Sequence, residues 1–273
     1  MKKILCPTDF SDAAFNAMAY AAKFAQATDA ELILYNVQSL TERMIQEAIF
    51  SNSFSTPNSL RELEGISREI SISFKISCYA DVEASNETLA KTIERKASGY
   101  DLIIMGTSGD DDLFDFLGGS NTYNVVRKSK IPVLVVPPKC TYSRIDKMVY
   151  AFNYLRERSL PVEQIVRWIE ALKCKLTVLQ IMEEAKSEEI DNELKELQSI
   201  IEHSEFGNQI KFDVMRTPHV SEGISNYMAN NNVDVLALCT HHKTFLEKLF
   251  HKSVIRKNIG NQTDNLPLFV FHR

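Results

Sequence analysis

The chain has 273 residues, which is long for one compact domain and sufficient for two of ordinary size. Its apolar content of 44% and charged content of 25% are ordinary for a globular protein. The formal net charge is -5, and the sequence contains no basic stripe, which argues against nucleic acid as a partner held through its phosphates.

Cysteine usage and the N-terminus indicate the compartment. The five cysteines are widely spaced and include no CxxC pair, which predicts reduced thiols and not a disulfide framework. The opening sequence MKKILCPTDF has only a short apolar run that Pro7 ends, so it predicts a first strand and not a signal peptide. No apolar run reaches membrane-spanning length. We therefore expect a cytoplasmic protein with no membrane partner.

Strand and helix patterns alternate along the first half. Short segments rich in β-branched and aliphatic residues, several without polar alternation, are typical of strands buried on both faces of a parallel sheet. These segments are residues 2–7, 31–37, 72–79, 101–106 and 131–137. Helical patterns lie at 11–27, where Ser11 is the expected N-cap, at 85–98 and at 120–130. The alternation predicts a doubly wound, flavodoxin-like α/β domain.

Residues 39–70, between the second and third predicted strands, form an insertion. The segment has helical patterns at both ends and a Ser/Asn/Pro break at 51–59. We expect a pair of helices that covers one face of the sheet, and a lid over a site stays open as an alternative.

The second half repeats this plan. Its predicted strands are residues 146–152, 175–181, 209–215, 233–240 and 266–271. Its first helix is predicted at 159–173, with Ser159 as N-cap and Pro161 in the first turn. The stretch VDVLALCT matches YDLIIMGT of the first half almost position by position. A repeat of this length indicates a tandem duplication, with domains at 1–140 and 141–273.

A glycine motif follows the fourth predicted strand, with the spacing Gly106-x2-Gly109-x9-Gly119-Ser120. Gly106 ends a parallel strand at its carboxyl edge, where open α/β sheets bind ligands, and its missing Cβ would admit a ligand close to the backbone. Gly119 and Ser120 precede a helix whose free N–H groups attract an anion. The motif predicts a phosphate site, and a glycine-rich turn without a ligand is the alternative.

These residues resemble a known family. GTSGDDDLFDFLGGS, followed by IPVLVVP, is similar to the G-x2-G-x9-G-(S/T) motif and closing strand of the ATP-binding branch of the universal stress protein family. The opening ILCPTDFSDAA resembles the first strand and loop of that family. The resemblance implies two flavodoxin- or Rossmann-like domains in tandem, each a doubly wound parallel sheet of the adenine nucleotide alpha-hydrolase type. It also implies that the first half binds ATP or AMP.

The resemblance also assigns site residues. It implies that Asp9 contacts the adenosine end and that Val37, which follows Asn36, lies near the base. The complete predicted nucleotide site is Pro7, Thr8, Asp9, Val37, Met105, Gly106, Gly109, Gly119, Ser120 and Asn121. No residue is assigned as catalytic or as a metal ligand.

The sequence departs from the family pattern after the second glycine, where Asp110, Asp111, Asp112 and Asp115 replace basic or neutral residues. One uncompensated carboxylate in contact with a triphosphate costs on the order of a few kcal/mol at an effective dielectric of about 20. Water and salt screen this repulsion, and a bound Mg²⁺ would make an aspartate into a ligand.

The second half lacks the motif. Cys239, His242 and Lys252 stand at the positions of the three glycines, and Asn153 stands at the position of Asp9. Their side chains would fill the space that a phosphate needs. The sequence therefore predicts nucleotide in the first half only.

The favoured function is that of an adenine-nucleotide-binding regulator of the stress response with an unknown protein partner. A slow, Mg²⁺-dependent nucleotide hydrolase and an interaction scaffold without nucleotide stay open as alternatives. No catalytic base is evident, so we expect at most slow ATP hydrolysis. The resemblance further implies an intrachain pseudo-dimer through strands 131–136 and 267–271, and a homodimer of the chain stays open.

Overall fold

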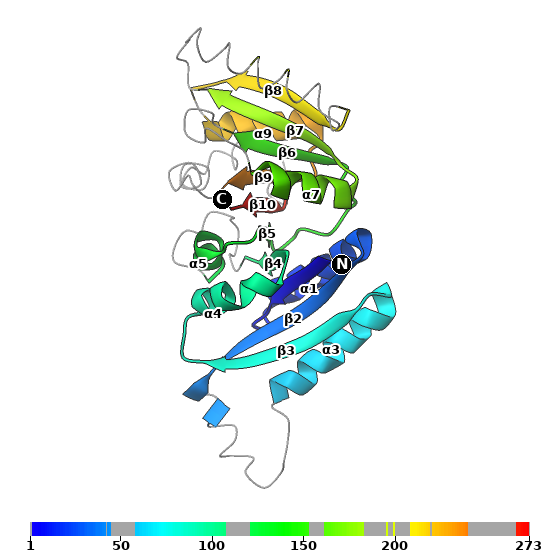
Figure 1. Ribbon diagram of the computed structural model, residues 1–273, viewed down its shortest axis with the longest axis vertical. Helices are drawn as coiled ribbons and strands as arrows, with labels where there is room; N and C mark the ends of the chain where they lie inside the picture. The colour runs from blue at the N-terminus through cyan, green and yellow to red at the C-terminus, as the bar shows by residue number, and fades with distance from the viewer. Residues whose placement is uncertain are drawn as a thin grey trace. The chain divides into compact units, whose positions relative to one another are not determined.

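The computed structural model divides the chain into two compact units (Figure 1). The first consists of Met1–Asp111 and Gly118–Tyr142, and the second of Asp112–Leu117 and Ser143–Arg273. The structure describes residues 2–41, 43–44, 58–107, 121–152, 161–182, 195, 199, 208–218, 220–239 and 266–272.

The first unit is built on a parallel sheet with the strand order β3-β2-β1-β4-β5. Its strands are β1 (Lys2–Pro7), β2 (Ala30–Ser39), β3 (Cys78–Ser85), β4 (Leu102–Gly106) and β5 (Val133–Val136). The chain proceeds from β1 outward to β3 and then returns to β4 on the other side of β1. The order therefore reverses between β1 and β4, and ligands of open α/β sheets bind at the carboxyl ends of such strands.

Helices cover this sheet on both faces. They are α1 (Asp12–Thr28), α3 (Asn58–Phe74), α4 (Leu89–Lys96), α5 (Asn121–Lys128) and the short 3₁₀ helix η1 (Ala97–Gly99). Helix α1 contacts α3, and α4 contacts α5. Figure 1 shows the two pairs on opposite sides of the sheet. The central strands are consequently buried on both faces, which explains their apolar sequences without alternation.

Helix α1 begins where the sequence predicts. The Ser11 side chain accepts a hydrogen bond from the backbone N–H of Ala14 at 3.2 Å, and so caps the helix. The helix ends at Asp29, whose φ of 50° lies in the left-handed region. Its buried face contains small residues, including Ala17 and Ala21, which let the helix approach the sheet closely.

The predicted third strand is wrong over most of its length. Residues 72–74 belong to α3, Lys75 turns the chain with a φ of 55°, and β3 begins only at Cys78. Buried residues recur at every fourth position of α3: Ser59, Leu63 and Ser67. This helical period decides the structure, although β-branched residues near the helix end favour a strand. One of them, Ile72, is 72% exposed and so does not lie in a buried strand.

The strand shift also moves the next helix. Ser85, predicted to begin a helix, is the last residue of β3, and α4 follows at Leu89 after the extended residue Thr88. Helix α3 supplies the second of the two helices predicted in the insertion. Residues 45–57, which hold most of its Ser/Asn/Pro break, lie outside the described residues.

The second unit has the same plan, with the strand order β8-β7-β6-β9-β10 and parallel pairing throughout. Its strands are β6 (Lys147–Phe152), β7 (Lys175–Met182), β8 (Ile210–Arg216), β9 (Val235–Cys239) and β10 (Leu268–Phe271). Its described helices include α7 (Val162–Leu172) and α9 (Val220–Asn231). The buried Trp168 of α7 packs against Phe269, with ring centroids 5.7 Å apart.

One detail of α7 differs from the prediction. Pro161 is the N-cap residue itself and does not lie in the first turn, and Ser159 lies outside the described residues. The predicted fold class, a doubly wound parallel α/β sheet, is confirmed in both units.

All five cysteines are free and buried. Burial raises the pKa of the Cys78 and Cys174 thiols to about 12 and that of Cys140 to about 11. Burial also raises the pKa of Cys6, in the core of β1. These thiols therefore stay protonated at neutral pH, and Cys6 is a small core residue and not a nucleophile.

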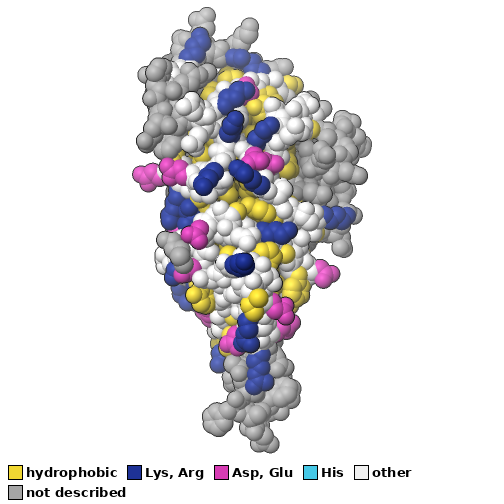
Figure 2. Space-filling view, turned by 90° about the vertical axis from the view of Figure 1, so that its right-hand side faces the viewer, with side chains coloured by type: hydrophobic (Ala, Val, Ile, Leu, Met, Phe, Trp, Pro, Cys, Tyr) yellow, Lys and Arg dark blue, Asp and Glu magenta, His cyan; other side chains and the backbone are white. Residues whose placement is uncertain are grey.

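Two surface observations bear on partners. On the face that Figure 2 shows, basic side chains stand among acidic and apolar ones. Among the helices within the described ranges, none is both long and apolar enough to cross a membrane.

Candidate functional site

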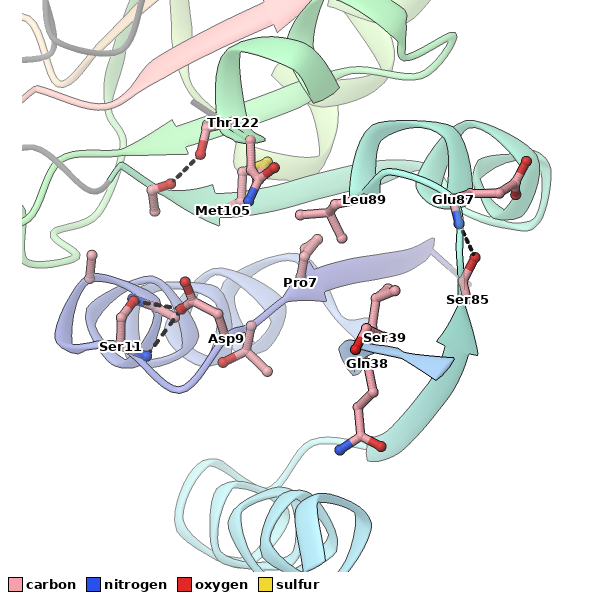
Figure 3. A pocket seen from close by; sticks show the side chains of 16 residues that line it. Pro7, Asp9, Ser11, Gln38, Ser39, Ser85, Glu87, Leu89, Met105 and Thr122 are labelled. Atoms are coloured by element: carbon pink, nitrogen blue, oxygen red, sulfur yellow. Dashed lines mark hydrogen bonds between the residues drawn. The ribbon is translucent and has the colours of Figure 1, made fainter. Parts of the chain in front are cut away.

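A cavity of about 290 Å³ lies at the carboxyl edge of the first sheet. The ends of β1, β2, β3 and β4 surround it, together with the first residues of α1, α4 and α5. Figure 3 shows Asp9 and Ser11 on one side of the cavity, and Ser85 and Glu87 on the other. The cavity therefore occupies the place where the strand order reverses, which is where open α/β sheets hold ligands.

The structure brings together most of the predicted site residues. Seven of them line the cavity: Pro7, Thr8, Asp9, Val37, Met105, Gly106 and Asn121. The other three, Gly109, Gly119 and Ser120, lie outside the described residues. The assignment of these residues to a nucleotide stays a prediction.

The loop between β1 and α1 fixes the position of the Asp9 carboxylate. The Thr8 hydroxyl oxygen accepts from the N–H of Phe10 at 3.1 Å, and Phe10 has a φ of 63°. Asp9 Oδ1 accepts from the Ser11 N–H at 3.1 Å and from the Ser11 hydroxyl at 2.6 Å. Both bonds end on Oδ1. Within the described part of the chain, Oδ2 is thus available to a donor on a ligand.

Asn36 ties this loop to β2. Its buried Nδ2 donates to the Thr8 carbonyl oxygen at 2.8 Å, and the Thr8 N–H donates to the Tyr35 carbonyl oxygen at 2.8 Å. These bonds hold the Asp9 loop against the end of β2, so that Asp9 and Val37 line the same cavity. A polar residue inside the apolar run LILYNV was the sequence signal for this role.

Gly106 has a structural reason in addition to the predicted one. A Cβ placed there would lie 2.5 Å from the Ala13 carbonyl oxygen, which is backbone of the first turn of α1. The glycine is therefore required by the close approach of α1 to the end of β4. The Gly106 carbonyl oxygen accepts from the Thr122 hydroxyl at 2.8 Å, which also ties the start of α5 to this strand.

Sequence reasoning missed several residues that line the cavity. They include Gln38, Ser39, Ser85, Glu87, Leu89 and Thr122. Ser85 accepts from the Glu87 N–H at 3.0 Å and thereby shapes the turn between β3 and α4. Ser85 and Glu87 were missed because the third strand was placed six residues too early. The signal was present, since CYADVEAS has the alternation of a half-exposed edge strand.

A charged network lies behind this turn. The Tyr35 hydroxyl donates to Glu83 Oε2 at 2.7 Å, and Arg95 binds the other oxygen of Glu83. Arg95 Nε is also 3.6 Å from Glu87 Oε2, and Lys96 Nζ lies 4.6 Å from the centre of the Tyr35 ring. Burial alone would raise the pKa of Glu83. The hydrogen bonds from Tyr35 and Arg95 and the charges of Arg95 and Lys96 outweigh burial and lower that pKa.

We predict that Tyr35→Phe destabilises the protein by about 1.5 kcal/mol at neutral pH, because it removes a hydrogen bond to a charged group. The pKa of Glu83 is lowered in the folded state, so its contribution is complete above the unfolded value of about 4.3 and is lost as the pH falls through the folded value. The difference between wild type and variant should therefore shrink below about pH 4. Urea unfolding across this range measures it.

Tyr79→Phe is the matched control, since Tyr79 lies on the neighbouring strand and is 54% exposed. We expect its effect to be small at every pH. A Tyr35→Phe difference that stays constant down to about pH 3 would show that the bond to Glu83 does not account for the loss.

Two further predictions concern metal ligands and the motif positions of the second unit. Within the described ranges, no three His, Cys, Asp or Glu side chains come together as a metal site, and Asp110, Asp111, Asp112 and Asp115 lie outside those ranges. In the second unit, Cys239 is buried at the end of β9, which corresponds to Gly106 at the end of β4. Asn153, His242 and Lys252 lie outside the described residues.

Comparison with known proteins gives consistent matches. The model of the universal stress protein family matches residues 1–137, just over half of the chain. Universal stress protein MJ0577 of Methanocaldococcus jannaschii is 34% identical over 159 residues, covering 50% of this chain and 96% of that protein. Universal stress protein MJ0531 of the same organism is 29% identical over 145 residues, covering 50% of this chain and 81% of that protein.

A solved structure extends the likeness in fold to both units. The structure of a universal stress protein from Archaeoglobus fulgidus covers 99% of this chain and 96% of its own, with a TM-score of 0.67 and 18% identity. At this identity the likeness shows the fold alone.

Proposed function

Because the chain belongs to the universal stress protein family, we propose that its first unit binds an adenine nucleotide, ATP or AMP, in the cavity beside β1 and β4. Binding would change the conformation of the protein or its choice of protein partner during the stress response. The observation that carries this proposal is the cavity itself, which lies at the reversal of the strand order and is lined by seven predicted site residues.

The lining suits a nucleoside. Asp9 Oδ2 would accept hydrogen bonds from the ribose hydroxyls. Val37, Leu89 and Met105 supply apolar surface for a base, and Val37 also offers backbone groups at the end of β2. The cavity volume of about 290 Å³ is near the lower end of small-molecule sites, which begin at about 300 Å³.

The phosphate end would lie toward Gly106 and the first residues of α5. Asn121 begins α5 and lines the cavity, and the unbonded N–H groups at a helix start favour an anion. Carboxylates are ligands that Mg²⁺ prefers, so Asp110, Asp111 and Asp112 would be candidates to hold Mg²⁺ when ATP binds as its magnesium complex.

The second unit would have no nucleotide site. In this proposal residues 141–273 are a degenerate copy of the first domain, in which Cys239 has replaced the first motif glycine. Its role would be to present a surface to a protein partner in the cytoplasm.

The test is native mass spectrometry of the freshly purified full chain, followed by calorimetric titration with AMP and with ATP, each with and without Mg²⁺. We expect one nucleotide per chain. Two nucleotides per chain would contradict binding in the first unit only, and no heat at millimolar nucleotide would contradict the function altogether. Release of phosphate from ATP during the titration would favour the slow hydrolase.

A further inference from the structure

We infer that this cavity selects among adenine nucleotides by their charge, and that without a divalent cation it binds AMP more tightly than ATP. The inference rests on the proposed nucleotide site and specifies which nucleotide that site prefers.

The wall of the cavity is acidic. Two carboxylates line it, Asp9 on one side and Glu87 on the other (Figure 3). Among the described residues that line the cavity, none is Lys, Arg or His. The charged part of this wall would therefore repel the phosphates of a nucleotide.

Neighbouring groups leave this negative charge largely in place. The Asp9 carboxylate receives hydrogen bonds from the neutral N–H and hydroxyl of Ser11, which fix its position and bring no positive charge to it. Glu87 lies 3.6 Å from Arg95, and both side chains are about half exposed, at 49% and 56%. Arg95 also pairs with Glu83, so its one positive charge is shared between two carboxylates.

The start of α5 opposes this repulsion, because Asn121 and Thr122 of its first turn line the cavity. The start of α5 supplies an opposing partial charge of only about +0.5. The helix start therefore attracts a phosphate group, while the repulsion from Asp9 and Glu87 grows with each further phosphate.

The expected selectivity follows from Coulomb's law. One pair of unit charges about 6 Å apart in a mostly aqueous site changes affinity about fivefold. We therefore expect binding to weaken about fivefold for each phosphate added beyond AMP, and the effect to diminish in high salt. Mg²⁺ neutralises part of the triphosphate charge, so it should reduce the gap between AMP and ATP.

The experiment is a calorimetric titration of the full chain with adenosine, AMP, ADP and ATP in EDTA, at low and at high salt. We expect AMP to bind most tightly among the three nucleotides, with an affinity about 25 times that of ATP at low salt. ATP binding as tightly as AMP in EDTA would overturn the selectivity while leaving the nucleotide site intact. Failure of all four ligands would instead overturn the proposed function itself.

Two variants, one in the turn before α4 and one in α4, test whether the cavity wall sets the preference for AMP. Glu87→Gln should reduce the ratio of AMP affinity to ATP affinity about fivefold, because it removes one carboxylate from the cavity wall. It also removes one of the carboxylates that pair with Arg95. Glu94→Gln is the matched control, since Glu94 is exposed on α4 and does not line the cavity. Equal changes in both variants would show that net charge, and not the wall, sets the ratio, and would overturn the inference.

Discussion

Gly106→Ala is expected to destabilise the first unit by about 3 kcal/mol and to lower its unfolding temperature by about 10 °C. The new Cβ would lie 2.5 Å from the Ala13 carbonyl oxygen and 3.0 Å from the Ala13 carbonyl carbon. Both atoms are backbone, so neither can move aside without shifting the first turn of α1. Differential scanning calorimetry of the full chain measures the change.

The matched control is Gly65→Ala. Gly65 lies within α3, and a Cβ there meets no heavy atom within 4 Å. Alanine favours the helix over glycine, so this variant should gain about 0.5–1 kcal/mol. If Gly106→Ala unfolds at the wild-type temperature, the close approach of α1 to β4 is not the reason for a glycine at this position.

Asp9→Ala is expected to weaken AMP binding about 10- to 100-fold, since it removes charge-assisted hydrogen bonds worth about 1.5–3 kcal/mol together. Asp9 is held at the cavity by Ser11 and accepts only on Oδ1 within the described chain, which leaves Oδ2 for the ribose. Calorimetric titration measures the loss. ATP binding should weaken less than AMP binding, because the variant also removes a repulsive charge.

Asp12→Ala is the matched control for this loss. Asp12 is also an exposed aspartate near the start of α1, three positions after Asp9, but it does not line the cavity. We expect AMP affinity to stay within about twofold of wild type in this control. Unchanged affinity in Asp9→Ala would remove Asp9 from the site and, with it, the proposed orientation of the nucleoside.

The parts of the fold that the sequence predicts well are those in which one physical signal dominates. The central strands β1, β4 and β9 are buried on both faces, so their apolar runs have no competing interpretation. The Ser11 cap has a local mechanism that depends on only four residues. The sequence predicts a duplication because VDVLALCT matches YDLIIMGT almost position by position.

The position of the third strand is predicted wrongly because helix and strand signals overlap in the sequence. Residues near Ile70 and Ile72 have strand propensity, but the buried positions of α3 repeat every fourth residue and continue the helix to Phe74. Edge strand β3 is only half buried and has charged residues, so it lacks the apolar run that marks the central strands. This single error hides Ser85 and Glu87, which are the two residues on the far side of the cavity from Asp9.

The sequence predicts those residues of the candidate site that lie at strand ends, but not the contacts between separate elements. Pro7, Asp9 and Gly106 stand at the ends of well-predicted strands, and the topology brings such ends together. The contact of Gly106 with Ala13 and the bond from Asn36 to Thr8 depend on distances between separate elements. A linear pattern does not contain those distances, so the structural roles of Gly106 and Asn36 appear only in three dimensions.

The proposed function requires that an adenine nucleotide occupies the cavity of the first unit. Photoaffinity labelling of the full chain with an azido derivative of AMP, followed by peptide mapping, tests it most directly. We expect label on peptides that contain residues 7–14, 37–39 or 85–89, and loss of that label when unmodified AMP competes. Label that AMP displaces from peptides of residues 143–273, or label that AMP does not displace at all, would show that the cavity of the first unit is not the nucleotide site.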